Sequence, residues 1–435
     1  MKLIVKRGAA PKGEIKISGD KSITHRAFLI SSLAQGKSAI TGYSRCADCM
    51  ATLNIIEKLG ASIEERGSSI YIGGRGHMGF SEPDDALDCG NSGTTMRLFA
   101  GVLSGQRFFS VLTGDSSLRK RPMDRIVKPL SMMGAHIHAR NGGKFAPLCI
   151  IGSPLRSVQY ALPVASAQVK SSILLAGLHA QGETCVREPC PTRNHTELML
   201  NFFGAEISDK NARIVIKGRV KLEAKNIAIP GDISSAAYFI ALGTIMPQSE
   251  LILNEIGINP TRTGILDVLK MMGAHISFSN CNTVSNESIA DLVINHARLK
   301  GTKISGRLIP RLIDEIPIIA VVATQAEGIT EIKDAAELRV KETDRITAIV
   351  NGLIKMGAKI EEREDGLVVK GPTRLQGTSC TSFGDHRIAM ALTIAGLIAD
   401  GETTIDDAGC IDVSFPEFTT NLRAVCDEKC ITAKN

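Results

Sequence analysis

The sequence predicts an α/β protein of two domains, each built from three copies of one repeated unit. Three observations support this prediction: the chain has 435 residues, a short phrase containing Gly-Ala recurs along it, and strongly apolar helical segments alternate with that phrase. A single hydrophobic core stops growing at about 250 to 300 residues. A chain of this length therefore divides into domains, and the repeat indicates how.

The composition is that of an ordinary globular protein, with 43% apolar and 22% charged residues. Trp is absent and aromatic residues make up only 4%, so Ala, Ile, Leu and Val must supply the packing. No run approaches the roughly 18 uncharged apolar residues of a membrane span, and the N-terminal segment lacks the apolar stretch of a signal peptide. We therefore expect a cytoplasmic protein that makes no membrane contact.

The charges and cysteines exclude two further classes of protein. The net charge of +6 comes without long Lys/Arg runs, which argues against a nucleic-acid partner and suits small anionic substrates. Of eleven Cys, only Cys46 and Cys49 form a C-x-x-C pair, and no second Cys or His pair with zinc-site spacing follows. We expect free thiols and no bound metal.

The repeat is visible as a phrase that ends an amphipathic helical stretch and begins a strand-like one. It reads KLGASI from Lys58, MMGAHI from Met132, FFGAEI from Phe202, MMGAHI from Met271 and KMGAKI from Lys355. The glycines lie about 70 to 85 residues apart, and a degraded sixth copy follows near Ala424. Each Gly is expected to form the left-handed cap that ends a helix.

A second series of segments lies between these phrases, and each reads as an apolar helix, a turn and a strand. Examples are MRLFAGVLSGQRFFSV and AMALTIAGLIADGETTI. Helices that are apolar nearly all round are buried, whereas helices with one polar face lie outside. The chain thus reads as six βαβ-type units, three in domain 1 (19–232) and three in domain 2 (1–18 and 233–435), joined by short crossovers.

Polar and basic residues stand at the starts of many of these apolar helices. A helix N-terminus offers unpaired N–H groups and the positive end of the dipole, so it suits a phosphate or carboxylate. In SGDKSITHRAFLI, Lys21, Ser22 and Arg26 can meet one anion, although an ordinary helix cap with solvated charges is an equally simple interpretation. Ser166 in SAQVKSSILL can likewise be a simple cap.

Including the Ser166 segment, seven segments besides that at Lys21 have the same character. They contribute Gly90 and Gly93 in DCGNSGTTMRLFAG, Arg121 in RKRPM, Gln168 and Lys170 after Ser166, Arg193 and His195 in PTRNHTELML, Asp314 and Glu315 in LIDEIPIIAVVA, Lys341, Glu342 and Arg345 in ELRVKETDRI, and Asp385, His386 and Arg387 in GDHRIAM. Lys341 and Arg345 are expected on one helical face, where an anion must separate them. Together these segments predict a cleft between domains that binds more than one anionic group.

The motifs GDKSITHRAFLI, GNSGTTMRL, RKRPM, SAQVKSSILLAGL, ELRVKETDRI and GDHRIAM, in this order, closely resemble the 5-enolpyruvylshikimate-3-phosphate synthases over essentially the full chain. The resemblance implies the enolpyruvyl transferase fold, a two-domain inside-out α/β barrel of six βαβαββ-type units. It implies the substrates shikimate 3-phosphate and phosphoenolpyruvate and no cofactor, and we expect a monomer.

The resemblance also implies roles for individual residues. The shikimate 3-phosphate contacts would be Lys21, Ser22, Arg26, Ser166, Gln168, Arg193, Asp314 and Lys341. The phosphoenolpyruvate contacts would be Lys21, Gly93, Arg121, Gln168, Arg345, His386 and Arg387. Asp314 would take the proton from the attacking hydroxyl, and Glu342 or Lys21 would handle the proton at the methylene carbon.

Two positions depart from the family pattern. Val413 stands where many members carry Lys, and Glu337 stands where many carry Asn. Both departures, with SAQVKS and TRNHTE, are typical of a divergent bacterial branch of the family. Gly93, where a methyl group would crowd the pocket, leaves room for the inhibitor glyphosate.

Two alternatives stay open at this point. A transferase acting on UDP-N-acetylglucosamine shares the repeat fold, but it typically uses a loop Cys that RKRPMDRI lacks. A relative that processes RNA phosphate ends is the other, although no nucleotide-binding loop is present.

Overall fold

The computed structural model describes residues 1–210 and 212–434; residue 211, inside predicted domain 1, and residue 435, the predicted end of domain 2, lie outside the described residues. The chain divides into two compact units. Unit 1 comprises Met1–Ser18, Pro230–Asn282 and Ser288–Asn435, and unit 2 comprises Gly19–Ile229 and Thr283–Glu287. The second crossover thus lies just before the predicted position, and a short segment near residue 285 joins unit 2.

The described residues form six four-stranded sheets with one shared strand pattern. In each sheet a short strand pairs in parallel with a longer one, which then pairs antiparallel with a third strand. The fourth strand lies beside the third, at the other edge. This common topology is the structural form of the sequence repeat.

Unit 2 holds three of these sheets within its described residues. The first is β14 (Ile227–Ala228), β3 (Gln35–Thr41), β5 (Ser69–Arg75) and β4 (Ser62–Arg66). The second is β6 (Leu87–Asp88), β7 (Phe109–Thr113), β9 (Phe145–Ile151) and β8 (His136–Ala139). The third is β10 (Gln159–Ala161), β11 (Glu183–Arg187), β13 (Arg213–Lys217) and β12 (Ile207–Lys210).

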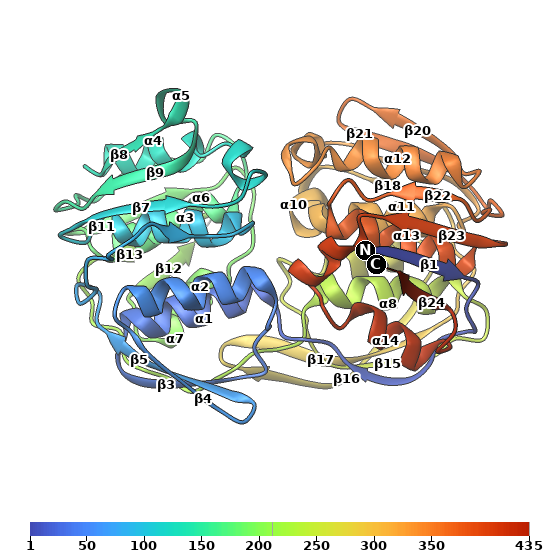
Figure 1. Ribbon diagram of the computed structural model, residues 1–435, viewed down its shortest axis with the longest axis horizontal. Helices are drawn as coiled ribbons and strands as arrows, with labels where there is room; N and C mark the ends of the chain where they lie inside the picture. The colour runs from blue at the N-terminus through green and yellow to red at the C-terminus, as the bar shows by residue number, and fades with distance from the viewer. Residues whose placement is uncertain (211, 435) are drawn as a thin grey trace. The chain divides into compact units, whose positions relative to one another are not determined.

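Two kinds of helix accompany the sheets of unit 2. The inner helices are α1 (Lys21–Leu33), α3 (Gly93–Leu103) and α6 (Ala167–Gly177), and the outer ones are α2 (Ala47–Lys58), α4 (Asp124–Met132) and α7 (His195–Phe202). The short helices η1 (Leu118–Lys120) and α5 (Arg140–Gly143) lie in connections. Figure 1 shows α3 and α6 side by side in the interior of the unit, where they pack on each other.

Unit 1 repeats the arrangement with its own three sheets in the described part of the chain. They are β2 (Lys12–Lys16), β15 (Glu250–Gly257), β17 (Glu287–Asn295) and β16 (His275–Val284); β18 (Lys303–Ile304), β19 (Gly328–Ile332), β21 (Gly366–Gly371) and β20 (Lys359–Arg363); and β22 (Ser379–Thr381), β23 (Glu402–Asp406), β1 (Lys2–Lys6) and β24 (Ile431–Lys434). Figure 1 shows the blue strand β1 among the red strands near the C-terminus.

The helices of unit 1 follow the same division. The inner helices are α8 (Ile233–Ile245), α11 (Ile316–Ala323) and α13 (His386–Ile398), and the outer ones are α9 (Gly264–Met271), α12 (Arg345–Lys355) and α14 (Phe418–Val425). Short helical turns are η2 (Gly306–Leu308), α10 (Ile309–Leu312), η3 (Ile313–Glu315), η4 (Ala336–Val340) and η5 (Ala408–Val413).

The core of each unit lies around its inner helices. Every residue of α8 and α11 is buried, and α13 has one residue that is not. Several strands bury alternate residues, as the patterns of β7, β13 and β23 show, so these strands turn one face inward and the other outward. The prediction that one helix series is buried and the other lies outside is confirmed.

The repeated Gly-Ala phrase ends five outer helices in the same way. Gly60, Gly134, Gly204, Gly273 and Gly357 all have positive φ, between 87° and 98°. At the first, Gly60 N donates to Glu57 O and Ala61 N donates to Ile56 O, the two bonds of a Schellman motif. The degraded copy near Ala424 lacks this motif, and α14 ends at Val425 with Cys426 in the αR region.

In the part of the chain that the structure describes, no helix combines the length and the apolar character needed to cross a membrane.

Candidate active site

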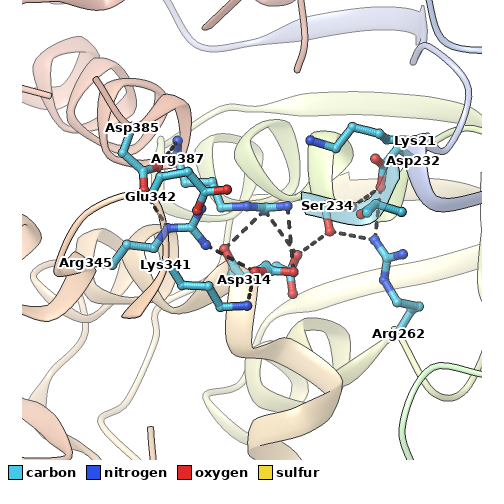
Figure 2. A network of polar contacts seen from close by, with 12 residues as sticks. Lys21, Asp232, Ser234, Arg262, Asp314, Lys341, Glu342, Arg345, Asp385 and Arg387 are labelled. Atoms are coloured by element: carbon cyan, nitrogen blue, oxygen red, sulfur yellow. Dashed lines mark hydrogen bonds and ion pairs between the residues drawn. The ribbon is translucent and has the colours of Figure 1, made fainter. Parts of the chain in front are cut away.

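One carboxylate in unit 1 faces three cations. Asp314 lies in η3, immediately before the apolar helix α11, and is nearly buried. Its Oδ1 lies 3.1 Å from Arg345 Nη1 and 3.6 Å from Lys341 Nζ, and its Oδ2 lies 3.9 Å from Arg387 Nη2. Figure 2 shows these three side chains turned toward Asp314. These cations thus offset the free-energy cost of burying a carboxylate at the start of an apolar helix.

Arg345 is the centre of this network and is shared among three carboxylates. Its Nε donates to Asp385 Oδ2 at 2.7 Å and its Nη2 donates to Glu342 Oε2 at 2.5 Å, in addition to the Asp314 bond. Burial alone lowers the pKa of a guanidinium, but Asp385, Glu342 and Asp314 outweigh it and raise the pKa of Arg345. Arg345 therefore stays charged in a buried position, where it is only 2% exposed.

The expectation that Lys341 and Arg345 share one helical face is wrong. Asp344 caps α12 by accepting a hydrogen bond from Thr347 N, so the helix begins at Arg345 and Lys341 lies before it, after η4. The two cations nevertheless point at one anion, because Asp314 Oδ1 lies near both. The predicted anion between them is a protein carboxylate.

A second polar cluster adjoins Asp314 through Glu315. Ser234 Oγ donates to Glu315 Oε1, and Arg262 Nη2 donates to Ser234 Oγ at 2.7 Å. Arg262 also pairs with Asp232, the cap of α8, at 3.2 Å. Arg387 connects the clusters, since its Nη1 donates to the Asp314 carbonyl at 3.1 Å and lies 3.6 Å from Glu315.

Sequence reasoning missed the residues Asp232, Ser234 and Arg262. A signal for two of them was present, because Gly-Asp-Ile-Ser at 231–234 repeats Gly-Asp-Lys-Ser at 19–22 in the corresponding place of the other domain. Arg262 lies in a connection before α9 and carries no such signal.

In unit 2 the guanidinium of Arg26 is held by three hydrogen bonds. Arg26 Nε donates to Thr196 Oγ1 at 2.6 Å, Nη1 donates to the Ser22 carbonyl at 2.8 Å and Nη2 donates to Ser171 Oγ at 3.0 Å. Arg26 is 4% exposed. A buried guanidinium held in place by several hydrogen bonds is oriented for an anion.

The first turn of α1 is capped by Asp20, which accepts a hydrogen bond from Ile23 N at 2.9 Å. Lys21 and Ser22 therefore do not cap this helix, and their contact with an anion stays a prediction. Lys21 Nζ lies 3.1 Å from Asp48 Oδ2. Ser166, in contrast, does cap its helix α6, because its Oγ accepts from Val169 N.

Gln168, Arg97 and Arg121 surround the start of α3. Arg97 Nη1 donates to Gln168 Oε1 and Nη2 donates to the Pro122 carbonyl at 3.3 Å. Arg121 Nη2 donates to Asn91 Oδ1 at 2.6 Å. Sequence reasoning missed Arg97, whose only signal is a lone charge inside an apolar helix.

Gly93 is the first residue of α3 and lies close to the ends of two arginine side chains. A Cβ at Gly93 would lie 2.9 Å from Arg97 Nη1 and 3.5 Å from Arg121 Nη1. A Cβ at this position would therefore make the end of the Arg97 side chain shift, and the place of Gly93 in a substrate pocket stays a prediction.

The eight polar segments do not all lie at equivalent places, which corrects one expectation. Those at Lys21, Gly93, Ser166, Asp314 and His386 precede or open inner helices. Those at Arg121, Arg193 and Arg345 precede or open the outer helices α4, α7 and α12. His386 is the buried first residue of α13, and Arg193 is half-buried before α7.

Comparison with known proteins identifies the family. Residues 5–422 match the family model of EPSP synthase (3-phosphoshikimate 1-carboxyvinyltransferase). The chain belongs to the EPSP synthase family. A curated relative of that name from Geotalea uraniireducens is 52% identical over 97% of this chain and 98% of its own length. Another from a Thermoanaerobacter species is 50% identical over 96% of this chain and 98% of its own.

Solved structures agree with this family. An EPSP synthase from Acinetobacter baumannii superposes with a TM-score of 0.90 at 42% identity, and the match covers 100% of both chains. The enolpyruvyl transferase NikO from Streptomyces tendae superposes with a TM-score of 0.79 at 16% identity over 99% of this chain and 98% of its own, which shows a shared fold. The predicted fold class is confirmed.

The two departures from the EPSP synthase pattern have definite places in the structure. Val413 is the half-buried last residue of η5, and Glu337 is an exposed residue of η4. All eleven cysteines have free thiols. Among the described residues, no three His, Cys, Asp or Glu side chains gather as they would around a metal ion.

Proposed function

We propose that the chain transfers the enolpyruvyl group of phosphoenolpyruvate to the 5-hydroxyl of shikimate 3-phosphate and releases phosphate, through a tetrahedral intermediate. The observation that carries this proposal is the similarity to relatives named 3-phosphoshikimate 1-carboxyvinyltransferase. About half of the aligned residues are identical, and the alignments cover nearly the whole chain. That name states the group transferred and its acceptor. The transfer itself needs a base, an acid and cations that hold phosphate, and the site supplies each type.

Asp314 is suited to be the base for the 5-hydroxyl. Lys341, Arg345 and Arg387 hold the carboxylate in one orientation. The guanidinium of Arg345 is itself shared among Asp314, Glu342 and Asp385. A carboxylate held in one orientation next to the substrate is suited to accept a proton.

Glu342 and Lys21 are the candidates for proton transfer at the methylene carbon of phosphoenolpyruvate. Glu342 is tied to Arg345 Nη2 yet keeps 22% of its side chain exposed, so a substrate can reach it. Lys21 Nζ pairs with Asp48 and is 19% exposed. Protonation at that carbon creates cationic character at its neighbour, which the hydroxyl then attacks.

The arginines and helix starts supply the anion-binding groups. We assign Ser22, Arg26, Ser166, Arg193, Asp314 and Lys341 to shikimate 3-phosphate, Gly93, Arg121, Arg345, His386 and Arg387 to phosphoenolpyruvate, and Lys21 and Gln168 to both. Membership of the divergent bacterial branch, a monomeric state and a cytoplasmic location stay predictions.

Phosphate release from phosphoenolpyruvate by the purified chain tests the proposal. We expect release that depends on shikimate 3-phosphate and does not occur when UDP-N-acetylglucosamine replaces it. Release with UDP-N-acetylglucosamine alone would favour the rival transferase and overturn the proposed acceptor.

A further inference from the structure

The first turn of α7 joins three separate parts of unit 2. Its first three residues, His195, Thr196 and Glu197, are 1%, 0% and 6% exposed, an unusual burial for three consecutive polar side chains. Each of them contacts a different partner. The role proposed for the chain uses Arg26 but leaves His195 and Glu197 without a task, so these buried groups call for an explanation.

Thr196 is one of the hydrogen-bond acceptors of Arg26. Its Oγ1 accepts from Arg26 Nε at 2.6 Å and lies 2.6 Å from Ser171 Oγ, which accepts from Arg26 Nη2. The guanidinium thus donates hydrogen bonds to one hydroxyl of α7 and one hydroxyl of α6. Any movement of the first turn of α7 moves one of these two acceptors.

His195 fixes that turn to a β-hairpin. Its Nδ1 donates to Glu287 Oε1 at 2.6 Å, and both side chains are buried, with exposed fractions of 2% and 3%. Glu287 is the first residue of β17, directly after a two-residue turn at Ser285 and Asn286 with φ of 49° and 65°. The imidazole of His195 therefore has a carboxylate partner held by a tight turn.

The tip of this hairpin is itself attached to unit 2. Asn286 Nδ2 donates to the Leu198 carbonyl of α7 at 3.3 Å, and Ser285 Oγ accepts from Ala228 N at 3.1 Å. The strands β16 and β17 pair within a sheet of unit 1, whereas 283–287 belongs to unit 2. Glu287 is thus presented to His195 by a segment far away in sequence.

Glu197 fixes the other side of the turn. Lys170 Nζ, on α6, lies 2.7 Å from Glu197 Oε1 and 2.9 Å from Glu188 Oε2, and the lysine side chain is 1% exposed. The turn is therefore held by charged groups on both sides of Thr196, and a truncation that leaves one of them buried without its partner shifts the turn.

We propose that Glu287 and His195 are positioning residues that act through the first turn of α7 on Arg26, and so tune the affinity for the phosphorylated acceptor substrate. The inference rests on the proposed function, in which Arg26 binds shikimate 3-phosphate. A displaced binding group costs up to about 100-fold when it moves by about 1 Å.

The test compares steady-state constants of the full-length chain and its variants. For Glu287→Ala we expect the KM for shikimate 3-phosphate to rise about tenfold or more, with the KM for phosphoenolpyruvate and kcat changed less than about threefold. Glu287→Gln keeps an oxygen that accepts the Nδ1 proton, so its KM should return to near the parent value. Glu206→Gln, which alters an exposed pair with Lys217 in the same unit, is the matched control and should behave as the parent.

A double-mutant cycle with Arg26→Lys separates positioning from general loss of structure. If Glu287 acts through Arg26, Glu287→Ala has little further effect on KM in the Arg26→Lys chain. Fully additive effects, or equal rises in both KM values, overturn the inference. If Glu287→Ala does not fold, Thr196→Val replaces it in the same cycle, with Thr196→Ser as the conservative partner.

Failure of the inference and failure of the proposed function give different results. If the parent chain releases no phosphate with shikimate 3-phosphate, the proposed function fails. If the parent chain turns over and Glu287→Ala keeps the parent KM for shikimate 3-phosphate, only the positioning role fails.

Discussion

Replacing Gly93 with Ala adds one methyl group at the start of α3, and the structure gives the size of the disturbance. The new Cβ would lie 2.9 Å from Arg97 Nη1, whereas ordinary contact begins at 3.4 Å, so the guanidinium must retreat by about 0.5 Å (3.4 − 2.9). Arg97 is held by Gln168 and by the Pro122 carbonyl. Its retreat weakens these bonds and crowds Arg121, whose Nη1 is 3.5 Å from the same Cβ.

The expected size of the effect follows from the bonds disturbed. A hydrogen bond to a charged group contributes about 1.5 to 3 kcal/mol, and a loss of about 1.4 kcal/mol is tenfold in affinity. We therefore expect the KM for phosphoenolpyruvate to rise about tenfold and inhibition by glyphosate to weaken. Stability should fall by no more than about 2 kcal/mol, because Ala favours a helix over Gly by about 1 kcal/mol, which offsets part of the weakened bonds, and Gly93 is not among the residues with positive φ.

Phosphate release measured against phosphoenolpyruvate, with and without glyphosate, checks this prediction, and thermal unfolding checks stability. Gly409→Ala is the matched control, since its Cβ would meet only Met1 Cβ, at 3.7 Å. Unchanged KM and inhibition constants in Gly93→Ala would refute the assignment of Gly93 to the phosphoenolpyruvate site.

Three further predictions concern other parts of the chain. Asp314→Asn should keep binding of shikimate 3-phosphate, measured by calorimetry, but lose about 10²- to 10⁴-fold in kcat; a near-normal kcat contradicts the role as base. Arg345→Met removes the guanidinium that three carboxylates share and should cost about 3 to 5 kcal/mol in urea unfolding, whereas Arg363→Met, at an exposed pair, should leave the midpoint nearly unchanged. Burial, and then the charge of His77, lowers the pKa of His179 from 6.5 to about 3. Below pH 6.5 the imidazole of His179 is therefore protonated in the unfolded chain but not in the folded chain, and the free energy of unfolding falls by about 1.4 kcal/mol per pH unit. For His179→Asn we expect a shallower fall of this free energy between pH 6.5 and 5. Equal slopes in the variant and the parent would contradict the low pKa.

The repeat was predictable because its signal is local. A left-handed residue that ends a helix strongly favours Gly, and five such glycines mark five helix ends without any knowledge of the fold. The unit boundaries are different. The segment 283–287 belongs to unit 2 through bonds such as Glu287 to His195, which join residues distant in sequence and leave no periodic pattern.

The candidate site likewise combines features that the local sequence predicts with features that depend on distant residues. Polar residues at helix starts can be read from sequence, because a cap and a dipole act over a few residues. The sequence does not show which charges pair. Arg345 contacts Asp385, which lies forty residues away, and nothing local predicts that partner. The helix face expected for Lys341 and Arg345 was wrong because Asp344 is a stronger start signal than the spacing of two charges.

The place of β1 has a consequence during synthesis of the chain. β1 is synthesised about 400 residues before β23 and β24 (402–406 and 431–434), yet it lies between them in the sheet. At about 10 residues per second the strand waits on the order of 40 seconds with both of its edges unpaired. Its sequence, Lys-Leu-Ile-Val-Lys, places a lysine at each end of the apolar run, and such flanking charges oppose aggregation of an exposed strand. Until β23 and β24 are made, the charges of Lys2 and Lys6 are therefore expected to oppose aggregation of β1.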